Sequence, residues 1–235
     1  MAKKQSSLYM TAGEQISGVV FFVIYLLVLP FATAPIFRFA ERLLATSLSP
    51  AMEHTIYYYV LFATTIIIFH NFLGRTTHYL FDRVSLVGKT LVAGLVAHYG
   101  LNELLYRVVN LVISSRTNLN DTTISAQIDD APRSTLLIVI FLAPFVEEVL
   151  FRGLVFGNLK NKSRLLGYAV SCALFALLHV WQFAVNHQDV TYFLVMVQYL
   201  VPGVVLAWAY EHSGTLWTAI GVHAAVNALS VLSVL

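Results

Sequence analysis

Two adjacent glutamates and an arginine interrupt a long apolar stretch in the second half of the chain. Glu147, Glu148 and Arg152 lie in a run, residues 136–156, whose other members are apolar or small. A charge at the bilayer centre costs on the order of 3 kcal/mol by insertion scales, so these side chains must be paired or face a polar cavity. On a helix, Glu148 and Arg152 share a face and can form an ion pair, whereas Glu147 points about 100° away. The pattern predicts either a buried ion pair that fixes helix packing or a catalytic carboxylate held by its neighbours.

Three more polar residues lie inside other apolar runs. His179 follows Phe175 by four residues, and His223 and Asn227 are also four apart and share a helix face. Taken singly, each histidine could instead bond a backbone carbonyl, and Asn227 could simply join two helices. Polar groups are costly to bury within the membrane, so their presence at similar depths on three helices indicates one shared role. We therefore expect the two glutamates, both histidines and Asn227 to meet in one pocket within the membrane.

Such a pocket can activate water in two ways. Without a metal, Glu147 is the general base and His179 orients the water or shares its proton. His223 and Asn227 then donate hydrogen bonds to the developing oxyanion. With a metal such as zinc, Glu147, His179 and His223 supply three ligands and leave a position open to water. The residues leave both versions open, and the absence of an H-E-x-x-H motif favours the metal-free one.

Composition indicates the setting in which these residues work. Of 235 residues, 58% are hydrophobic and 11% are charged, and the mean hydropathy is +0.75. Soluble domains contain about a quarter charged residues, so the chain is expected to be an integral membrane protein. The net charge of +2, with no basic cluster, argues against nucleic-acid binding. Cys172 is the only cysteine, which excludes an intrachain disulfide.

The apolar segments predict an all-α, polytopic transmembrane helix bundle with about seven spans. The predicted spans are residues 16–37, 55–73, 90–113, 134–156, 165–185, 191–210 and 216–235. Pro30 and Pro35 are expected to bend or end the first span. Residues 38–53 are amphipathic and are expected at the membrane edge, and residues 114–133 are expected to form a mobile polar loop. We expect one membrane domain in two parts, N-terminal helices and loop (1–133) and a catalytic-motif core (134–235).

The distribution of basic residues predicts that the N-terminus is inside, because cytoplasmic loops carry an excess of lysine and arginine. The predicted inner side holds Lys3, Lys4, Arg75, Arg83, Lys89, Lys160, Lys162 and Arg164. The predicted outer side holds Arg38, Arg42, Arg116 and Arg133.

The polar residues also resemble a family pattern. Glu147 to Arg152 matches the E-E-x-x-x-R motif of the CAAX protease and bacteriocin-processing family, also called the Abi family. Phe175 to His179 matches its F-x-x-x-H motif, and His223 to Asn227 matches its H-x-x-x-N motif. Order and spacing agree, and the resemblance extends over about residues 136–229.

The resemblance implies an intramembrane endopeptidase that hydrolyses membrane-associated or peptide substrates. It assigns water activation to Glu147 with His179, oxyanion support to His223 and Asn227, and a structural role to Glu148 with Arg152. The family has been described both as metalloproteases and as glutamate proteases, so zinc stays open. The short chain looks most like prokaryotic members, which implies a multi-pass protein of a prokaryotic cell membrane. The alternative is a non-catalytic immunity or scaffold protein that binds a peptide in the same cavity.

Overall fold

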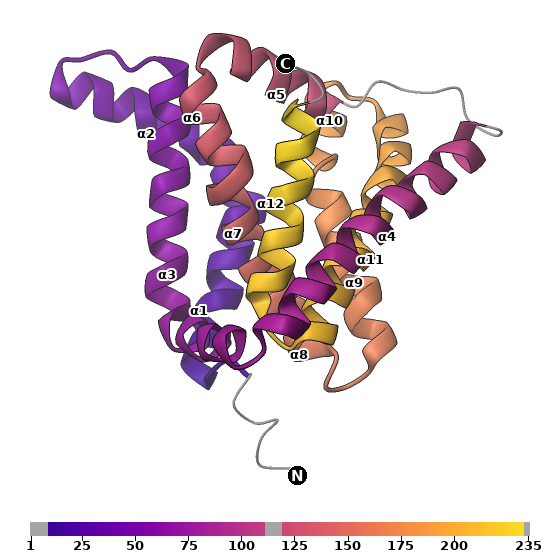
Figure 1. The fold of residues 1–235 in the computed structure, drawn as a ribbon. Helices are drawn as coiled ribbons and strands as arrows, with labels where there is room; N and C mark the ends of the chain where they lie inside the picture. The colour runs from indigo at the N-terminus through magenta and orange to yellow at the C-terminus, as the bar shows by residue number, and fades with distance from the viewer. Residues whose placement is uncertain (1–8, 111–118, 233–235) are drawn as a thin grey trace.

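The computed structural model describes residues 9–110 and 119–232, and these form a bundle of helices (Figure 1). The first half contains α1 (Ala12–Val23), the π-helical segment η3 (Ile24–Val28), α2 (Leu29–Leu44), α3 (Pro50–Asp82) and α4 (Val84–Asn110). Then come α5 (Leu119–Asp130), α6 (Pro132–Leu137), η4 (Ile138–Leu142), α7 (Ala143–Glu148), η5 (Val149–Phe156) and α8 (Gly157–Leu159). The last elements are α9 (Arg164–Leu178), α10 (Trp181–Asn186), the 3₁₀ segment η6 (Val190–Met196), α11 (Val197–Ser213) and α12 (Leu216–Leu232).

The predicted all-α membrane bundle is confirmed. Within the described part of the chain, five helical stretches are long and apolar enough to cross a membrane. They are Ala12–Leu44, Pro50–Asp82, Val84–Val108, Pro132–Leu159 and Val190–Ser213. Two shorter apolar helices, Arg164–Leu178 and Leu216–Leu232, coincide with the remaining predicted spans. The ends of the third and seventh predicted spans, like Lys3 and Lys4, lie outside the described residues.

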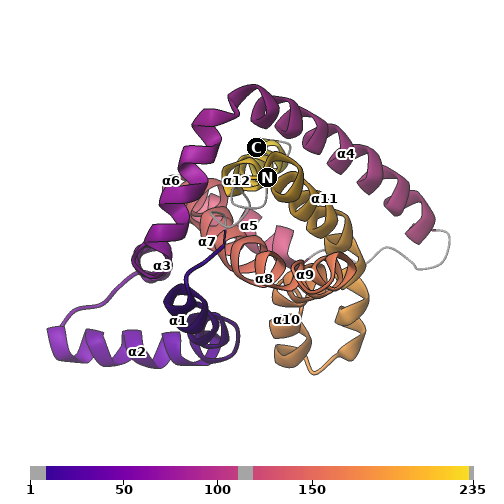
Figure 2. The ribbon, with the colours of Figure 1, turned by 90° about the horizontal axis from the view of Figure 1, so that it is seen from below.

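The first helical stretch changes direction near Pro30, as its sequence predicts. Seen from below, α1 is viewed nearly end-on while α2 is viewed from the side, so α2 runs outward from one end of α1, at the periphery of the bundle (Figure 2). Pro30 has no N–H to continue the helix, and the π-helical segment η3 ends directly before α2. The amphipathic residues that follow therefore lie at the edge of the bundle.

A buried carboxylate stabilises the bend in α3. The helix is interrupted at Phe69, whose φ of −106° and ψ of 20° are not helical. Glu14 of α1 accepts a hydrogen bond of 2.7 Å from the Phe72 backbone N–H, just beyond this bend. Arg75 donates to the Glu14 carboxylate at 3.2 Å and to the Tyr9 carbonyl at 2.8 Å. The start of α1 is thus attached to the bent part of α3.

Replacing Glu14 by alanine should destabilise this junction. The Phe72 N–H and the Arg75 guanidinium would both lose an acceptor, and an unsatisfied buried donor costs about 1–3 kcal/mol. Thermal unfolding in detergent should show a lower Tm for Glu14→Ala. Ser17→Ala is the matched control, because the exposed Ser17 hydroxyl bonds only the Gly13 carbonyl of its own helix. Equal Tm values for the two variants would contradict this account of the bend.

The prediction of a mobile polar loop over residues 114–133 is wrong for its described part. Residues Leu119–Asp130 form helix α5, and α6 begins at Pro132. Ile128 is buried, and the Thr135 hydroxyl of α6 donates to the Gln127 carbonyl at 2.9 Å. The polar composition of these residues is typical of a loop, but packing against α6 stabilises them as helix α5. Residues 114–118 lie outside the described part.

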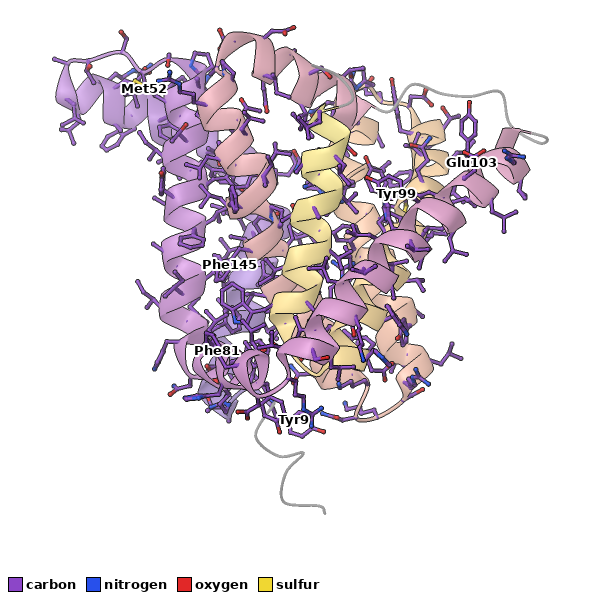
Figure 3. All side chains as sticks on the ribbon, in the orientation of Figure 1. Tyr9, Met52, Phe81, Tyr99, Glu103 and Phe145 are labelled. Carbon is purple, nitrogen blue, oxygen red and sulfur yellow. The ribbon has the colours of Figure 1, made fainter. Side chains whose placement is uncertain are left out.

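The helix that carries the two glutamates is the central one. In the most apolar 18-residue segment of Pro132–Leu159, 67% of the residues are buried, compared with 22–33% in the corresponding segments of the other four long stretches. Its segments α7 and η5 contact α1, α3, α9, α11 and α12, which surround it in Figure 2. Phe145 lies between α3 and α12 (Figure 3), with its ring 4.7 Å from Phe62 and 6.0 Å from Trp217. The predicted division of the membrane domain into parts 1–133 and 134–235 stays a prediction, and its boundary falls inside α6.

Close packing around this helix depends on one glycine. A Cβ at Gly153 would lie 2.9 Å from the ring of Phe72 in α3 and 3.1 Å from Met10. These approaches are shorter than van der Waals contact, so a side chain at residue 153 would require the Phe72 ring or the Met10 side chain to shift. The small residue expected at a helix–helix contact is therefore found where α3 meets the central helix.

Candidate active site

The predicted ion pair is present and is part of a larger buried network. Arg152 donates to the Glu148 carboxylate at 2.8 Å, and both side chains are fully buried. Arg152 also donates to the Gly203 carbonyl of α11 at 3.3 Å, and its guanidinium lies 4.2 Å from the centre of the Phe175 ring. His223 Nδ1 lies 2.9 Å from the same Glu148 oxygen that Arg152 contacts. The network thus joins the central helix to α9, α11 and α12.

Glu147 faces a different group of side chains, as its position next to Glu148 predicts. Its Oε2 atom lies 4.0 Å from His179 Nε2 and 4.0 Å from His223 Nε2. The carboxylate is buried, with 7% of the residue exposed, and Oε2 has no hydrogen-bond partner among the described residues. The structure therefore brings together the glutamate and the two histidines that the sequence analysis singled out.

His179 is positioned by the end of its own helix. The predicted span over residues 165–185 is wrong in its second part, because α9 ends at Leu178 and α10 begins separately at Trp181. The His179 ring donates through Nδ1 to the Phe175 carbonyl at 2.8 Å. In a continuing α-helix, the backbone N–H of residue 179 would donate to the Phe175 carbonyl. Here the His179 side chain donates to that carbonyl instead of the backbone. The ring also stacks on Tyr199, with centroids 4.4 Å apart.

Hydrogen bonds on the far side of each ring define what faces Glu147. A carbonyl only accepts, so His179 Nδ1 carries the proton that bonds Phe175. Glu148 Oε1 accepts from Arg152, and a carboxylate oxygen is an acceptor, so His223 Nδ1 donates to it. In a ring that is protonated only on Nδ1, Nε2 is an acceptor facing the Glu147 carboxylate, whereas a second proton on His223 would make its Nε2 a donor. Three acceptors around one point require a proton, a proton donor such as water, or a cation between them.

The spacing of the three atoms distinguishes among these occupants. Ligand atoms about 2.0 Å from a tetrahedral zinc are about 3.3 Å apart, whereas Glu147 Oε2 is 4.0 Å from each histidine Nε2. A water molecule at hydrogen-bond distance, about 2.8 Å from each atom, fits the 4.0 Å separations with an angle near 90°. Among the described residues, no group of three or more metal-ligating side chains is arranged as a metal site. The donor types suit zinc, but the geometry suits water better.

Asn227 is not directed at this group. Its side-chain amide donates to the Val139 carbonyl of the central helix at 2.8 Å. The prediction that Asn227 joins the histidines as a donor in the pocket is therefore not what the structure shows. The contact of Asn227 with Val139 was not predicted, because a sequence does not reveal which backbone carbonyls lack a hydrogen-bond donor in their own helix.

A cavity of 470 Å³ connects Glu147 and His179 with one end of the bundle. Its walls include Thr33 of α2 and Pro50 at the start of α3, so it extends from Glu147 toward the end of the bundle where α2 lies. Its polar lining includes Glu53, His54, Tyr57, Tyr58, Gln127 and Gln182.

Several residues of the site were missed or misassigned from the sequence. A run of three tyrosines beside an apolar stretch, as at residues 57–59, is typical of an aromatic belt at the membrane surface. In the structure Tyr57 and Tyr58 line the cavity, and only Tyr59 of the three is exposed. Tyr199, which stacks on His179, gave no signal because it comes from a separate helix. Glu103 and Arg107, four residues apart in α4, form an exposed ion pair at 2.7 Å, and Glu103 lies far from the central helix (Figure 3).

Comparison with known proteins agrees with this geometry. Residues 130–229 match the family model described as type II CAAX prenyl endopeptidase Rce1-like. The matched region contains all the motif residues described above, so the match supports the resemblance to the CAAX protease and bacteriocin-processing family. The Rce1-like family is generally a family of proteases. No curated protein and no solved structure matches the chain.

Proposed function

We propose that this protein is an intramembrane endopeptidase in which Glu147 activates water for attack on a peptide bond. The observation that carries the proposal is the buried Glu147 Oε2 atom, which has no hydrogen-bond partner among the residues that the structure describes and lies 4.0 Å from two imidazole nitrogens. A water molecule at this point would donate hydrogen bonds to Glu147 and His179 and accept one from His223 when its Nε2 is protonated. General-base assistance of this kind contributes about 10²–10⁴-fold to a reaction rate.

Each neighbouring residue has a role in the proposed reaction. Glu147 takes one proton from the water as the water oxygen bonds to the scissile carbonyl carbon. His179 Nε2 accepts a hydrogen bond from the second O–H of that water. His223 carries a proton on Nε2 and donates it as a hydrogen bond to the developing oxyanion. Glu147 then transfers its proton to the leaving nitrogen as the carbon–nitrogen bond breaks.

The buried ion network supports His223 in this role. Glu148 accepts from His223 Nδ1 at 2.9 Å and therefore stabilises the imidazolium, as a carboxylate does behind a catalytic histidine. Arg152 holds Glu148 in place at 2.8 Å. Asn227 is not assigned to the oxyanion, because its amide donates to Val139.

The reaction is proposed to be metal-free, so chelation should not abolish it. Treatment of the purified protein with a strong chelator should leave the cleavage rate within about twofold, because no step needs a Lewis acid. The measurement is peptide cleavage before and after dialysis against chelator. Loss of activity that added zinc restores would make Glu147, His179 and His223 metal ligands and would contradict the proposal.

The proposed substrate is a peptide or protein segment that enters the cavity from the membrane or its surface. A direct test is cleavage by the purified protein in bilayers, read by mass spectrometry. The peptides would include pairs ending in a CAAX sequence, with and without a prenyl group. Cleavage of any pair supports the proposal and indicates whether the prenyl group is needed. Binding that survives in Glu147→Gln, with no cleavage by the unaltered protein, would instead indicate a peptide-binding immunity or scaffold protein.

The distribution of basic residues supports an orientation with the N-terminus inside. The end of the bundle where α1 begins also holds the junction of α3 with α4 and the turn after α8 (Figure 1). These segments contain Arg75, Arg83, Lys89, Lys160, Lys162 and Arg164. The opposite end holds α2 and the start of α6 (Figure 1), which contain Arg38, Arg42 and Arg133. An excess of basic residues marks the cytoplasmic side. In this orientation the cavity extends from Glu147 toward the outer side of the membrane.

A further inference from the structure

One backbone carbonyl just before the glutamates has no donor in its own helix. The Ala143 N–H donates to the Ile138 carbonyl, five residues back, as in a π-helix. The next bond of that type would join residue 144 to the Val139 carbonyl, but residue 144 is Pro144, which has no N–H. The α-helical donor for Val139 would be the Ala143 N–H, and it is already bonded to Ile138.

Asn227 supplies the missing donor from another helix. Its Nδ2 atom lies 2.8 Å from the Val139 carbonyl oxygen. An unpaired carbonyl is costly inside a membrane, where no water can replace the lost partner. Helix α12 packs on η4 here, so the bond fastens α12 to the π-helical turn. The proline and the asparagine are therefore complementary, since one removes a hydrogen bond and the other restores it.

We infer that Asn227 is a positioning residue that holds the π-helical turn and, through it, the orientation of Glu147. A π-helical turn contains one residue more than an α-helical turn, and each residue corresponds to about 100° of rotation around the axis. Glu147 follows Pro144 by three residues, so the direction of its carboxylate depends on this turn. Helix α12 thus contacts the central helix twice, through His223 on Glu148 and through Asn227 on Val139. The inference rests on the function proposed above for Glu147.

This role differs from donation to an oxyanion in a way that a second substitution reveals. Pro144→Ala places an N–H at residue 144, where it can donate to the Val139 carbonyl. If the function of Asn227 is to donate to the Val139 carbonyl, removing Asn227 should lower Tm and kcat much less once residue 144 can donate to that carbonyl. If Asn227 serves the oxyanion, an N–H at residue 144 cannot replace it.

The test is a double-substitution cycle with two readouts, Tm in detergent and kcat at a temperature where all variants are folded. Asn227→Ala should lower Tm by roughly 3 °C and kcat by about tenfold or more. In the Pro144→Ala background, the same substitution should cost less than half as much in both readouts. Pro202→Ala is the matched control, because Pro202 lies inside α11 and its replacement supplies no donor to Val139. Combined with Asn227→Ala, it should give no rescue.

Several outcomes would overturn the inference. One is an equal cost of Asn227→Ala in both backgrounds, and another is rescue by Pro202→Ala as well. If Pro144→Ala does not fold, Asn227→Asp takes its place, since it puts an oxygen against the Val139 carbonyl and should lower Tm at least as much as Asn227→Ala. An unchanged Tm for Asn227→Asp would also overturn the inference. Should the unaltered protein cleave no peptide, the proposed function fails, while the Tm cycle still tests the contact.

Discussion

Glu147→Gln should abolish peptide cleavage while leaving the fold intact. Glutamine keeps the shape of the side chain but cannot take a proton from water, so kcat should fall by roughly 10³-fold or more. Tm should change little, because Glu147 Oε2 has no hydrogen-bond partner to lose among the described residues. The measurement is kcat for the two purified proteins on the same peptide.

The matched control is Glu103→Gln. Glu103 is also a glutamate on a membrane helix, but it is exposed and paired with Arg107 at 2.7 Å. Its replacement should leave kcat within about twofold, since exposed ion pairs contribute little. Full activity of Glu147→Gln would refute the general-base role. Equal losses in both variants would indicate a general effect of removing charge.

The second large effect is expected on stability. Arg152→Met should lower the free energy of unfolding by about 3–5 kcal/mol, because it leaves Glu148 as a buried carboxylate without its guanidinium partner. Methionine fills much of the same volume, so the loss of charge and of the hydrogen bond to Gly203 dominates. Tm in detergent should fall by about 10 °C or more. Cleavage should fall as well, because Glu148 no longer holds His223.

Arg107→Met controls for the removal of an arginine from a membrane helix. Arg107 is 74% exposed in its side chain, and the pair it forms with Glu103 has the same four-residue spacing as Glu148 with Arg152. The expected change is within about 0.5 kcal/mol. A similar Tm for Arg107→Met and Arg152→Met would contradict the central place of the buried network.

Burial cost explains which parts of the site could be predicted from the sequence. Glu147, His179 and His223 are expensive inside an apolar bundle, so their presence at similar depths indicated a shared pocket, and the structure brings them together. The pairing of Glu148 with Arg152 followed from helical spacing alone. The lengths of the apolar runs indicated the five long apolar helical stretches and the two shorter ones, Arg164–Leu178 and Leu216–Leu232.

Other features depend on contacts between distant parts of the chain, and the sequence does not display these. The break after His179 arises because a side chain, not the backbone, bonds the Phe175 carbonyl. The partner of Asn227 depends on a carbonyl that a proline leaves free in another helix. Helix α5 has a polar composition typical of a loop, and its buried Ile128 is recognisable only after packing is known.

The most direct test of the central claim is a single-turnover cleavage in oxygen-18 water. If Glu147 activates water that attacks the substrate directly, the new carboxyl group of the product carries the label from the first turnover, and Glu147 carries none. Mass spectrometry of the product and of the Glu147 peptide gives both values. An unlabelled product together with label in Glu147 would mean that the carboxylate itself attacks the peptide bond, and it would contradict the account.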